Sequence, residues 1–150
     1  MDKNTLYCNK DMIELIETND IEYIVNLSYE ESKHEFTKEQ IRSVFDISEY
    51  YFWLLNKNGI IGGVAGFIII DGFYILEALR DRSTKDWTLR DSLYVGEIVI
   101  NKIFEVSDRA RTFARVNDRA IQILCKKLKF KELFIKDGFI IYERERLICQ

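Results

Sequence analysis

The sequence predicts an α/β (α+β) fold built on a mixed, mostly antiparallel sheet. Helical periodicity fills most of the chain before Glu49. Asx-Gly pairs, which are strong hairpin signals, then separate long apolar runs. A strand, helix, strand order between Phe73 and Val116 predicts one parallel crossover, which should be right-handed.

Length and charge limit the functional classes. A chain of 150 residues suits a single domain spanning residues 1–150, with a real hydrophobic core. The formal charge of −3, with both signs mixed along the chain, makes nucleic acid or anionic lipid an unexpected partner, so any basic site must be local. The sequence contains neither a recognisable secretory signal nor an apolar run long enough to predict a membrane segment.

Three cysteines are present, and their spacing matches no zinc or disulfide framework. Cys8, Cys125 and Cys149 are therefore expected to be reduced thiols, and the protein is expected to be cytoplasmic. His34 is the single histidine and lies in a charged segment, which predicts a surface position and no metal site.

The first part of the chain predicts a short strand followed by two or three helices. Thr5 to Cys8 suits the strand, and the apolar residues from Met12 to Ile16 suit one face of a helix. Two further helices are predicted by polar residues that are followed three positions later by Glu or Gln. These pairs are Asn19 with Glu22 and Thr37 with Gln40.

The middle of the chain predicts a three-stranded antiparallel meander. The three strands are Tyr50 to Leu55, Ile60 to Ile70 and Phe73 to Leu79. Asn58-Gly59 and Asp71-Gly72 provide the turns between them.

The last part predicts a helix, a strand, a second helix and a final hairpin. Thr88 with Asp91 suits the start of the first helix. The stretch VNDRAIQILCKKLKF follows the strand Arg111 to Val116 and reads as a helix that Asn117 caps. The hairpin consists of Phe130 to Ile135 and Phe139 to Glu143, joined at Asp137-Gly138.

This order resembles that of the GNAT superfamily of N-acetyltransferases over essentially the whole chain. The most specific local match is Asn117-Asp118-Arg119-Ala120 followed by Leu128-Lys129-Phe130. The resemblance implies a GNAT fold with a sheet of six or seven strands and helices on both faces. It also implies acetyl-CoA as co-substrate and an acyl-CoA-dependent N-acyltransferase activity.

The resemblance implies a pyrophosphate site at the start of the helix after Thr88, where the family carries a glycine-rich segment. The counterpart here is Arg90 to Val95, with Leu93 and Val95 at the glycine positions. Basic side chains and the helix N-terminus would replace those glycines, as in divergent, often phage-encoded GNAT proteins. The cofactor-binding candidates are Leu79, Arg80, Arg82, Lys85, Arg90 and Asn117. The alternative is a solvated loop balanced by Asp81, Asp86 and Asp91.

Glu77 and Cys125 are the catalytic candidates that follow from the resemblance. Glu77 lies in an apolar run, where desolvation would raise its pKa toward that of a general base, although an outward-facing surface Glu is equally compatible. Cys125 or Leu124 occupies the position of the family's tyrosine acid, depending on the end from which the helix is counted. A buried structural cysteine is the more common role for such a residue.

Two functions remain open at this point. The first is transfer of acetyl from acetyl-CoA to an amine of a small molecule or protein, with acidic Glu30, Glu31 and Glu35 favouring a cationic acceptor. The second is a catalytically inactive GNAT-like protein that binds a partner protein. An unrelated α+β binding domain is a third possibility. Apolar Leu147 to Cys149 or an exposed strand edge would support a homodimer.

Overall fold

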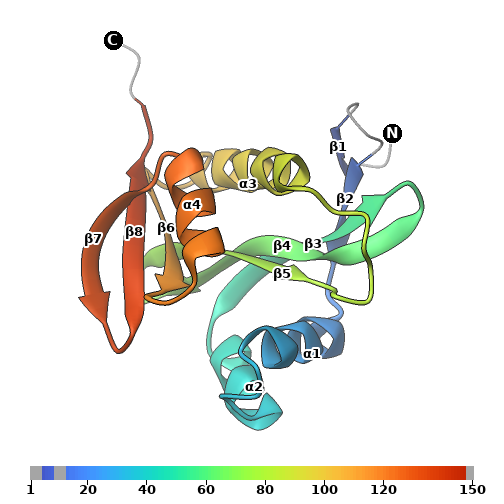
Figure 1. The fold of residues 1–150 in the computed structure, drawn as a ribbon, viewed down its shortest axis with the longest axis horizontal. Helices are drawn as coiled ribbons and strands as arrows, with labels where there is room; N and C mark the ends of the chain where they lie inside the picture. The colour runs from blue at the N-terminus through green and yellow to red at the C-terminus, as the bar shows by residue number, and fades with distance from the viewer. Residues whose placement is uncertain (1–4, 9–12, 148–150) are drawn as a thin grey trace. The chain divides into compact units, whose positions relative to one another are not determined.

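The computed structural model describes residues 5–8 and 13–147, with side chains described for residues 13–147. The chain forms two compact units (Figure 1). The first unit contains the described chain up to Ile68 together with Glu77–Trp87. The second contains Ile69–Leu76 and the chain from Thr88 onward, so β4 and β5 contribute residues to both units.

The first unit contains the N-terminal strands and helices. Its strands follow the order β1-β2-β3-β4-β5, and β2 pairs antiparallel with both β1 and β3. The strands are β1 (Thr5–Cys8), β2 (Ile13–Thr18), β3 (Glu49–Lys57), β4 (Ile60–Ile70) and β5 (Phe73–Arg80). Helices α1 (Ile21–Glu31) and α2 (Lys38–Asp46) contact each other, and Arg42 of α2 binds Glu22 of α1 through two hydrogen bonds of 3.1 and 2.9 Å.

The second unit contains the crossover and the final hairpin. Its elements are α3 (Leu89–Phe104), β6 (Arg109–Arg115), α4 (Arg119–Lys127), β7 (Lys131–Lys136) and β8 (Phe139–Glu145). The strand order is β5-β6-β8-β7. Strands β5 and β6 are parallel, with Ile75 beside Arg111, which confirms the predicted parallel crossover.

All three predicted Asx-Gly turns are present. Asn58, Asp71 and Asp137 have φ of 54°, 52° and 51°, and the glycine after each also has positive φ, between 80° and 86°. Two successive residues in the left-handed region are what a tight hairpin matched to the strand twist requires. The predicted meander and final hairpin are therefore confirmed.

The helix predicted around Met12 to Ile16 is wrong, because Ile13–Thr18 is strand β2; Met12 itself lies outside the described residues. Ile13 and Leu15 are 1% and 0% exposed, which is the period of two of a strand. Every residue of β2 pairs with one of β3, so tertiary pairing decided the conformation of a short apolar run that suits either structure. Eight strands result among the described residues, against six or seven expected.

Two of the four predicted helix starts are confirmed, and those at Asn19 and Asn117 are each displaced by one residue. Thr37 with Gln40 and Thr88 with Asp91 form complete capping boxes. Asn19 does not cap α1, since the carboxylate of Asp20 accepts the Tyr23 N–H at 3.2 Å. The Asp20 N–H in turn donates to the Thr18 hydroxyl.

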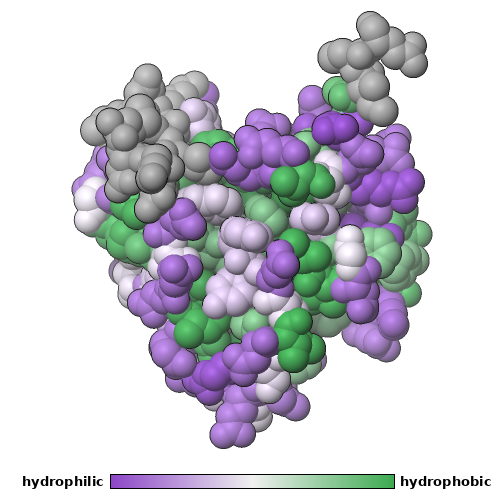
Figure 2. All heavy atoms as spheres, turned by 180° about the vertical axis from the view of Figure 1, so that it is seen from behind, coloured by the Kyte–Doolittle hydropathy of each residue, from purple (hydrophilic) through white to green (hydrophobic). Residues whose placement is uncertain are grey.

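The core of the second unit lies between its sheet and its helices. Val99, Ile100 and Ile103 of α3 are fully buried, as are Ala110 of β6 and Tyr142 of β8. Both α3 and α4 contact β6. On the face in Figure 2, hydrophobic and hydrophilic residues are interspersed. None of the described helices is both long and apolar enough to cross a membrane.

Candidate functional site

The first unit brings together five of the predicted site residues along one segment. They are Glu77, Leu79, Arg80, Arg82 and Lys85, at the end of β5 and in the loop that follows it. Leu79 is buried, and the Gly63 Cα faces its carbonyl oxygen so closely that a Cβ would overlap it. The backbone of β5 is thus packed tightly against β4 at Leu79.

The carboxylate of Glu77 is partly desolvated. Its side chain is half-buried, and none of the described residues gives it a hydrogen bond or an ion pair. Desolvation raises its pKa to about 7 from an ordinary value of 4.5. Glu77 therefore changes charge near neutral pH, which is the range a general base requires.

Asp81 anchors the loop after β5, a role that was not predicted from the sequence. Its carboxylate accepts hydrogen bonds from the Ser83 hydroxyl at 2.6 Å, the Ser83 N–H at 3.1 Å and the Tyr23 hydroxyl at 3.0 Å. The bond from Ser83 lowers the pKa of Asp81, and burial with Asp81 as neighbour raises the pKa of Tyr23. An Asp two residues before a Ser is an Asx-turn signal that the sequence does contain.

Some basic residues of this loop bind other residues of the chain, and others do not. The Arg82 guanidinium pairs with Glu31 of α1 at 3.4 Å, and that of Arg80 donates to the Thr84 carbonyl at 3.2 Å. Lys85 is exposed, and no described residue forms an ion pair with it. The loop therefore leaves Lys85 and part of Arg80 available to an anion.

The second unit contains the start of α3. The Asp91 carboxylate is 2% exposed and accepts the Thr88 N–H at 2.9 Å, while the Thr88 hydroxyl accepts the Asp91 N–H. The N–H groups of Leu89 and Arg90 have no acceptor among the described residues, and both side chains are exposed. The first turn thus keeps two free donors beside the charge of Arg90.

The stretch from Arg90 to Val95 is regular helix and not a loop. Val95 is 2% exposed and belongs to the core, and Leu93 is half-buried. No residue between Asp81 and Thr88 has positive φ. The backbone from Asp81 to Val95 therefore has no conformation that requires glycine.

Asn117 does not cap α4. The carboxylate of Asp118 accepts the Ile121 N–H at 3.2 Å and occupies that position. Asn117 lies one residue earlier in an exposed turn, and no described residue bonds its side-chain amide. The Gln122 side chain stabilises this turn, because its amide donates to the Arg115 and Val116 carbonyls at 2.9 and 3.0 Å.

Cys125 is a free, buried thiol on α4. Burial raises its pKa to about 12, so the thiol is neutral at pH 7 and a weaker proton donor than an exposed cysteine. Tyr142 of β8 is fully buried, and its hydroxyl has no hydrogen-bond partner among the described residues. Cys8 and Cys149 lie outside the described side chains.

Two of the three acidic side chains that were expected to favour a cationic acceptor are engaged by neighbouring side chains. Glu30 pairs with His34 at 3.2 Å, and Glu31 pairs with Arg82. His34 is exposed and stacks on Tyr29 with ring centroids 4.1 Å apart, so the prediction of a surface histidine is confirmed. Within the described chain, no three His, Cys, Asp or Glu side chains are grouped as metal ligands.

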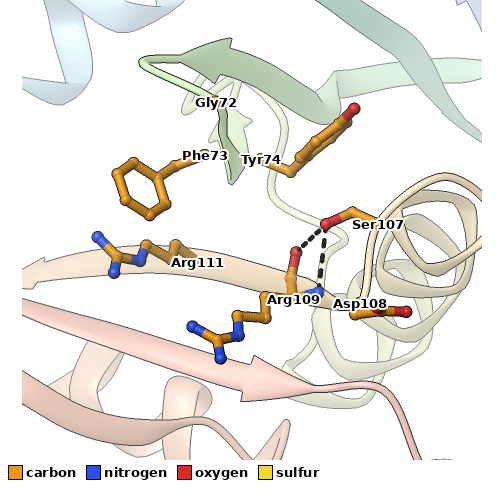
Figure 3. Close-up of a pocket in the computed structure, with 7 residues that line it drawn as sticks. All are labelled: Gly72, Phe73, Tyr74, Ser107, Asp108, Arg109 and Arg111. Atoms are coloured by element: carbon orange, nitrogen blue, oxygen red, sulfur yellow. Dashed lines mark hydrogen bonds between the residues drawn. The ribbon is translucent and has the colours of Figure 1, made fainter.

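A pocket of about 210 Å³ lies within the second unit, and none of the predicted site residues lines it (Figure 3). It is lined by Gly72, Phe73, Tyr74, Ser107, Asp108, Arg109 and Arg111. The Ser107 hydroxyl bonds both the N–H and the carbonyl of Arg109, which fixes the start of β6 (Figure 3). The Arg111 guanidinium lies 3.7 Å from the centroid of the Phe73 ring and bonds Glu143 at 2.8 Å.

Comparison with known structures identifies the fold. N-acetyltransferase PseH of Campylobacter jejuni, in complex with acetyl coenzyme A, matches 91% of this chain and 100% of its own with a TM-score of 0.63 and 14% identity. A putative phosphinothricin N-acetyltransferase matches 89% of this chain and 97% of its own (TM-score 0.66, 15% identity). The ribosomal-protein-S18-alanine N-acetyltransferase of Escherichia coli matches 93% and 97% (TM-score 0.61, 14% identity).

The chain therefore has the GNAT fold, as predicted. This likeness contradicts the third possibility, an unrelated α+β domain. By sequence, no protein-family model and no curated protein matches the chain.

Proposed function

We propose that this protein is an N-acetyltransferase that moves acetyl from acetyl-CoA to an amine. The observation that carries the proposal is Glu77, a half-buried carboxylate on β5 without a partner among the described residues and with a pKa of about 7. An unpaired, desolvated carboxylate is costly to stability, and such groups cluster at functional sites. The GNAT fold and the acetyl-CoA complex of PseH support the same reaction class.

In this mechanism Glu77 removes a proton from the acceptor ammonium, either directly or through one water, and so produces the neutral amine nucleophile. Deprotonated Glu77 also attracts the cationic form of the acceptor before it accepts the proton. Acetyl-CoA supplies the activated acyl group when bound. An amine of a small molecule or of a protein is the proposed acceptor.

Each unit, taken by itself, has donors of the kind that acetyl-CoA needs. The free N–H groups of Leu89 and Arg90 at the start of α3, with the Arg90 side chain, suit a phosphate. Arg80, Arg82 and Lys85 add positive charge in the loop after β5, and the Leu79 backbone borders that loop. The side-chain amide of Asn117, which no described residue bonds, suits the amide groups of a pantetheine chain.

The alternative is a GNAT-fold protein that binds a partner protein and does not catalyse transfer. Cys125 supports this alternative, because a buried thiol with a pKa of about 12 is a poor substitute for a tyrosine acid. Under the enzyme proposal Cys125 still fills the acid position, and Cys125→Ala should then lower kcat. If the thiol only packs, Cys125→Ala should lower stability and leave kcat unchanged.

A measurement of acetyl-CoA binding distinguishes the acetyltransferase from the partner-binding alternative. Acetyl-CoA at 100 times its Kd should stabilise the fold by about 2.7 kcal/mol, which raises Tm by roughly 5–10 °C for a domain of this size. ATP at the same concentration is the control for binding through phosphates alone. Release of free coenzyme A with a panel of amines then measures the reaction. No change in Tm with millimolar acetyl-CoA would contradict the enzyme proposal.

Alanine substitutions at Asn117 and at Asp118 distinguish an effect on ligand binding from an effect on helix capping. Asp118→Ala should destabilise the protein by about 1 kcal/mol, because α4 loses its N-cap. Asn117→Ala should leave stability within about 0.5 kcal/mol and raise the Kd for acetyl-CoA about fivefold or more, the cost of one hydrogen bond. Urea denaturation and calorimetric titration measure the two effects. Equal effects of both variants on Kd would contradict a direct role for Asn117.

A further inference from the structure

One face of the sheet in the second unit carries basic and aromatic side chains and no helix of that unit. Residues directly opposite each other in a β-ladder share a face. Arg111 is opposite Glu143, and Phe113 is opposite Ile141, which in turn is opposite Phe134 of β7. We call this surface the open face. The other face carries Ala110, Ala114 and Tyr142, which are buried.

Helices α3 and α4 cover that other face. Arg144, which lies on it beside Tyr142, donates to Glu97 of α3 at 2.8 Å and to the Leu128 carbonyl at the end of α4 at 3.0 Å. Three phenylalanines of the open face are exposed instead. Phe73, Phe113 and Phe134 are 41%, 37% and 46% exposed.

Charge on the open face is opposite in sign to that of the whole chain. The pairing of β6, β8 and β7 places five basic side chains there, which are Arg109, Arg111, Arg115, Lys131 and Lys136. Within these three strands Glu143 and Glu145 are the acidic residues on this face, so β6, β8 and β7 contribute a charge of +3 against −3 for the chain. Glu143 is 9% exposed and held by Arg111 at 2.8 Å, so its charge is already matched.

The basic and aromatic side chains alternate in contact with one another. Arg111 lies 3.7 Å from the Phe73 centroid and 5.9 Å from that of Phe134, and Arg115 lies 4.8 Å from that of Phe139. Phe113 and Phe139 meet edge to face at 5.5 Å. Figure 3 shows Phe73, Arg109 and Arg111 around the pocket at one end of this face.

We propose that the open face binds single-stranded nucleic acid. Exposed rings on a sheet offer stacking surfaces to unpaired bases, and arginine and lysine between them neutralise the phosphates. A second copy of the chain is disfavoured on this face, because two surfaces of +3 repel each other. The proposal does not depend on acetyl transfer, and its test contains no acetyl-CoA.

Fluorescence anisotropy with a labelled 12-nucleotide single-stranded RNA of mixed sequence tests the proposal on the full chain. We expect saturable binding at low salt, with a Kd that rises steeply as salt is added. A DNA duplex of equal length and a poly-glutamate peptide should bind at least tenfold more weakly. No binding of the single strand at low salt would overturn the proposal. Equal affinity for poly-glutamate would do so as well, since the face would then be a site for acidic peptides.

Two substitution pairs locate the binding. Phe134→Ala should raise the Kd for the RNA by about fivefold or more, because one base stack is lost. Phe36→Ala, which changes a similarly exposed phenylalanine of the first unit, should leave the Kd unchanged.

Lys131→Glu with Lys136→Glu should weaken binding at least tenfold. The double change should also lower the slope of log K against log salt by about 1.4. Lys126→Glu with Lys127→Glu on α4 changes the net charge equally, and an equal loss there would overturn the assignment to this face. Tm of each variant confirms that it is folded.

Discussion

Glu77→Gln is expected to lower kcat/KM for acetyl transfer by about 100- to 10,000-fold, the usual contribution of a general base. The amide keeps the shape of the side chain but cannot accept the proton. Rates of coenzyme A release measure the effect. Glu49→Gln, at an exposed carboxylate of β3, is the control and should retain full activity. Activity of the unsubstituted protein should rise with pH through about 7, because the base must be deprotonated.

The same substitution should stabilise the protein at pH 8. Since the pKa of Glu77 is about 7 in the folded chain and about 4.5 when unfolded, the folded state binds more protons between these values. Stability is therefore complete below pH 4.5 and falls as pH rises through 7, by at most about 3.5 kcal/mol for a difference of about 2.5 pH units at about 1.4 kcal/mol each.

Glu77→Gln removes this loss, so the two proteins should be equally stable at pH 4 and differ most at pH 8. Urea denaturation at both pH values measures the difference. A variant that loses activity without gaining stability at pH 8 would contradict the desolvated state of Glu77.

Gly66→Ala is expected to destabilise the protein by about 3 kcal/mol or more. A Cβ on Gly66 of β4 would overlap the Tyr51 carbonyl oxygen and lie 2.7 Å from the Phe52 Cα of β3. Both are backbone atoms of a paired strand, so neither can rotate away as a side chain would. The midpoint of urea unfolding measures the loss.

Gly59→Ala is the control for the Gly66 prediction. Gly59 has φ of +86°, and no atom lies within 4 Å of the place a Cβ would take, so alanine there meets only backbone strain of about 1 kcal/mol. Equal losses at Gly59 and Gly66 would contradict the close approach of β3 and β4.

Local chemistry explains why much of the fold was predictable. The Asx-Gly turns and the capping boxes at Thr37 and Thr88 depend on backbone conformation and on bonds within four residues, which the sequence contains. β2 was not predictable in this way, because Ile13–Thr18 suits a helix or a strand and only its pairing with β3 distinguishes them.

The candidate site was predictable in residue type but not in detail. Glu77 was singled out by its apolar neighbours, and desolvation does raise its pKa. Asn117 and Asp118 are both good N-caps, and the choice between them depends on where α4 begins, which is set by how Gln122 holds the preceding turn. Asp81 was missed because its bond to Tyr23 joins residues 58 positions apart.

The sequence by itself determined the Asx-Gly turns, the capping boxes at Thr37 and Thr88, and the presence of an ionisable residue in an apolar strand, since these depend on neighbours in the chain. Only the tertiary structure decided that Ile13–Thr18 is a strand, that no described residue bonds the side-chain amide of Asn117, and that five cations and four phenylalanines gather on one sheet face. The net charge of a chain does not say where its charged residues lie on the surface. The register of β6, β8 and β7 sets those positions, so a chain of −3 can present a face of +3.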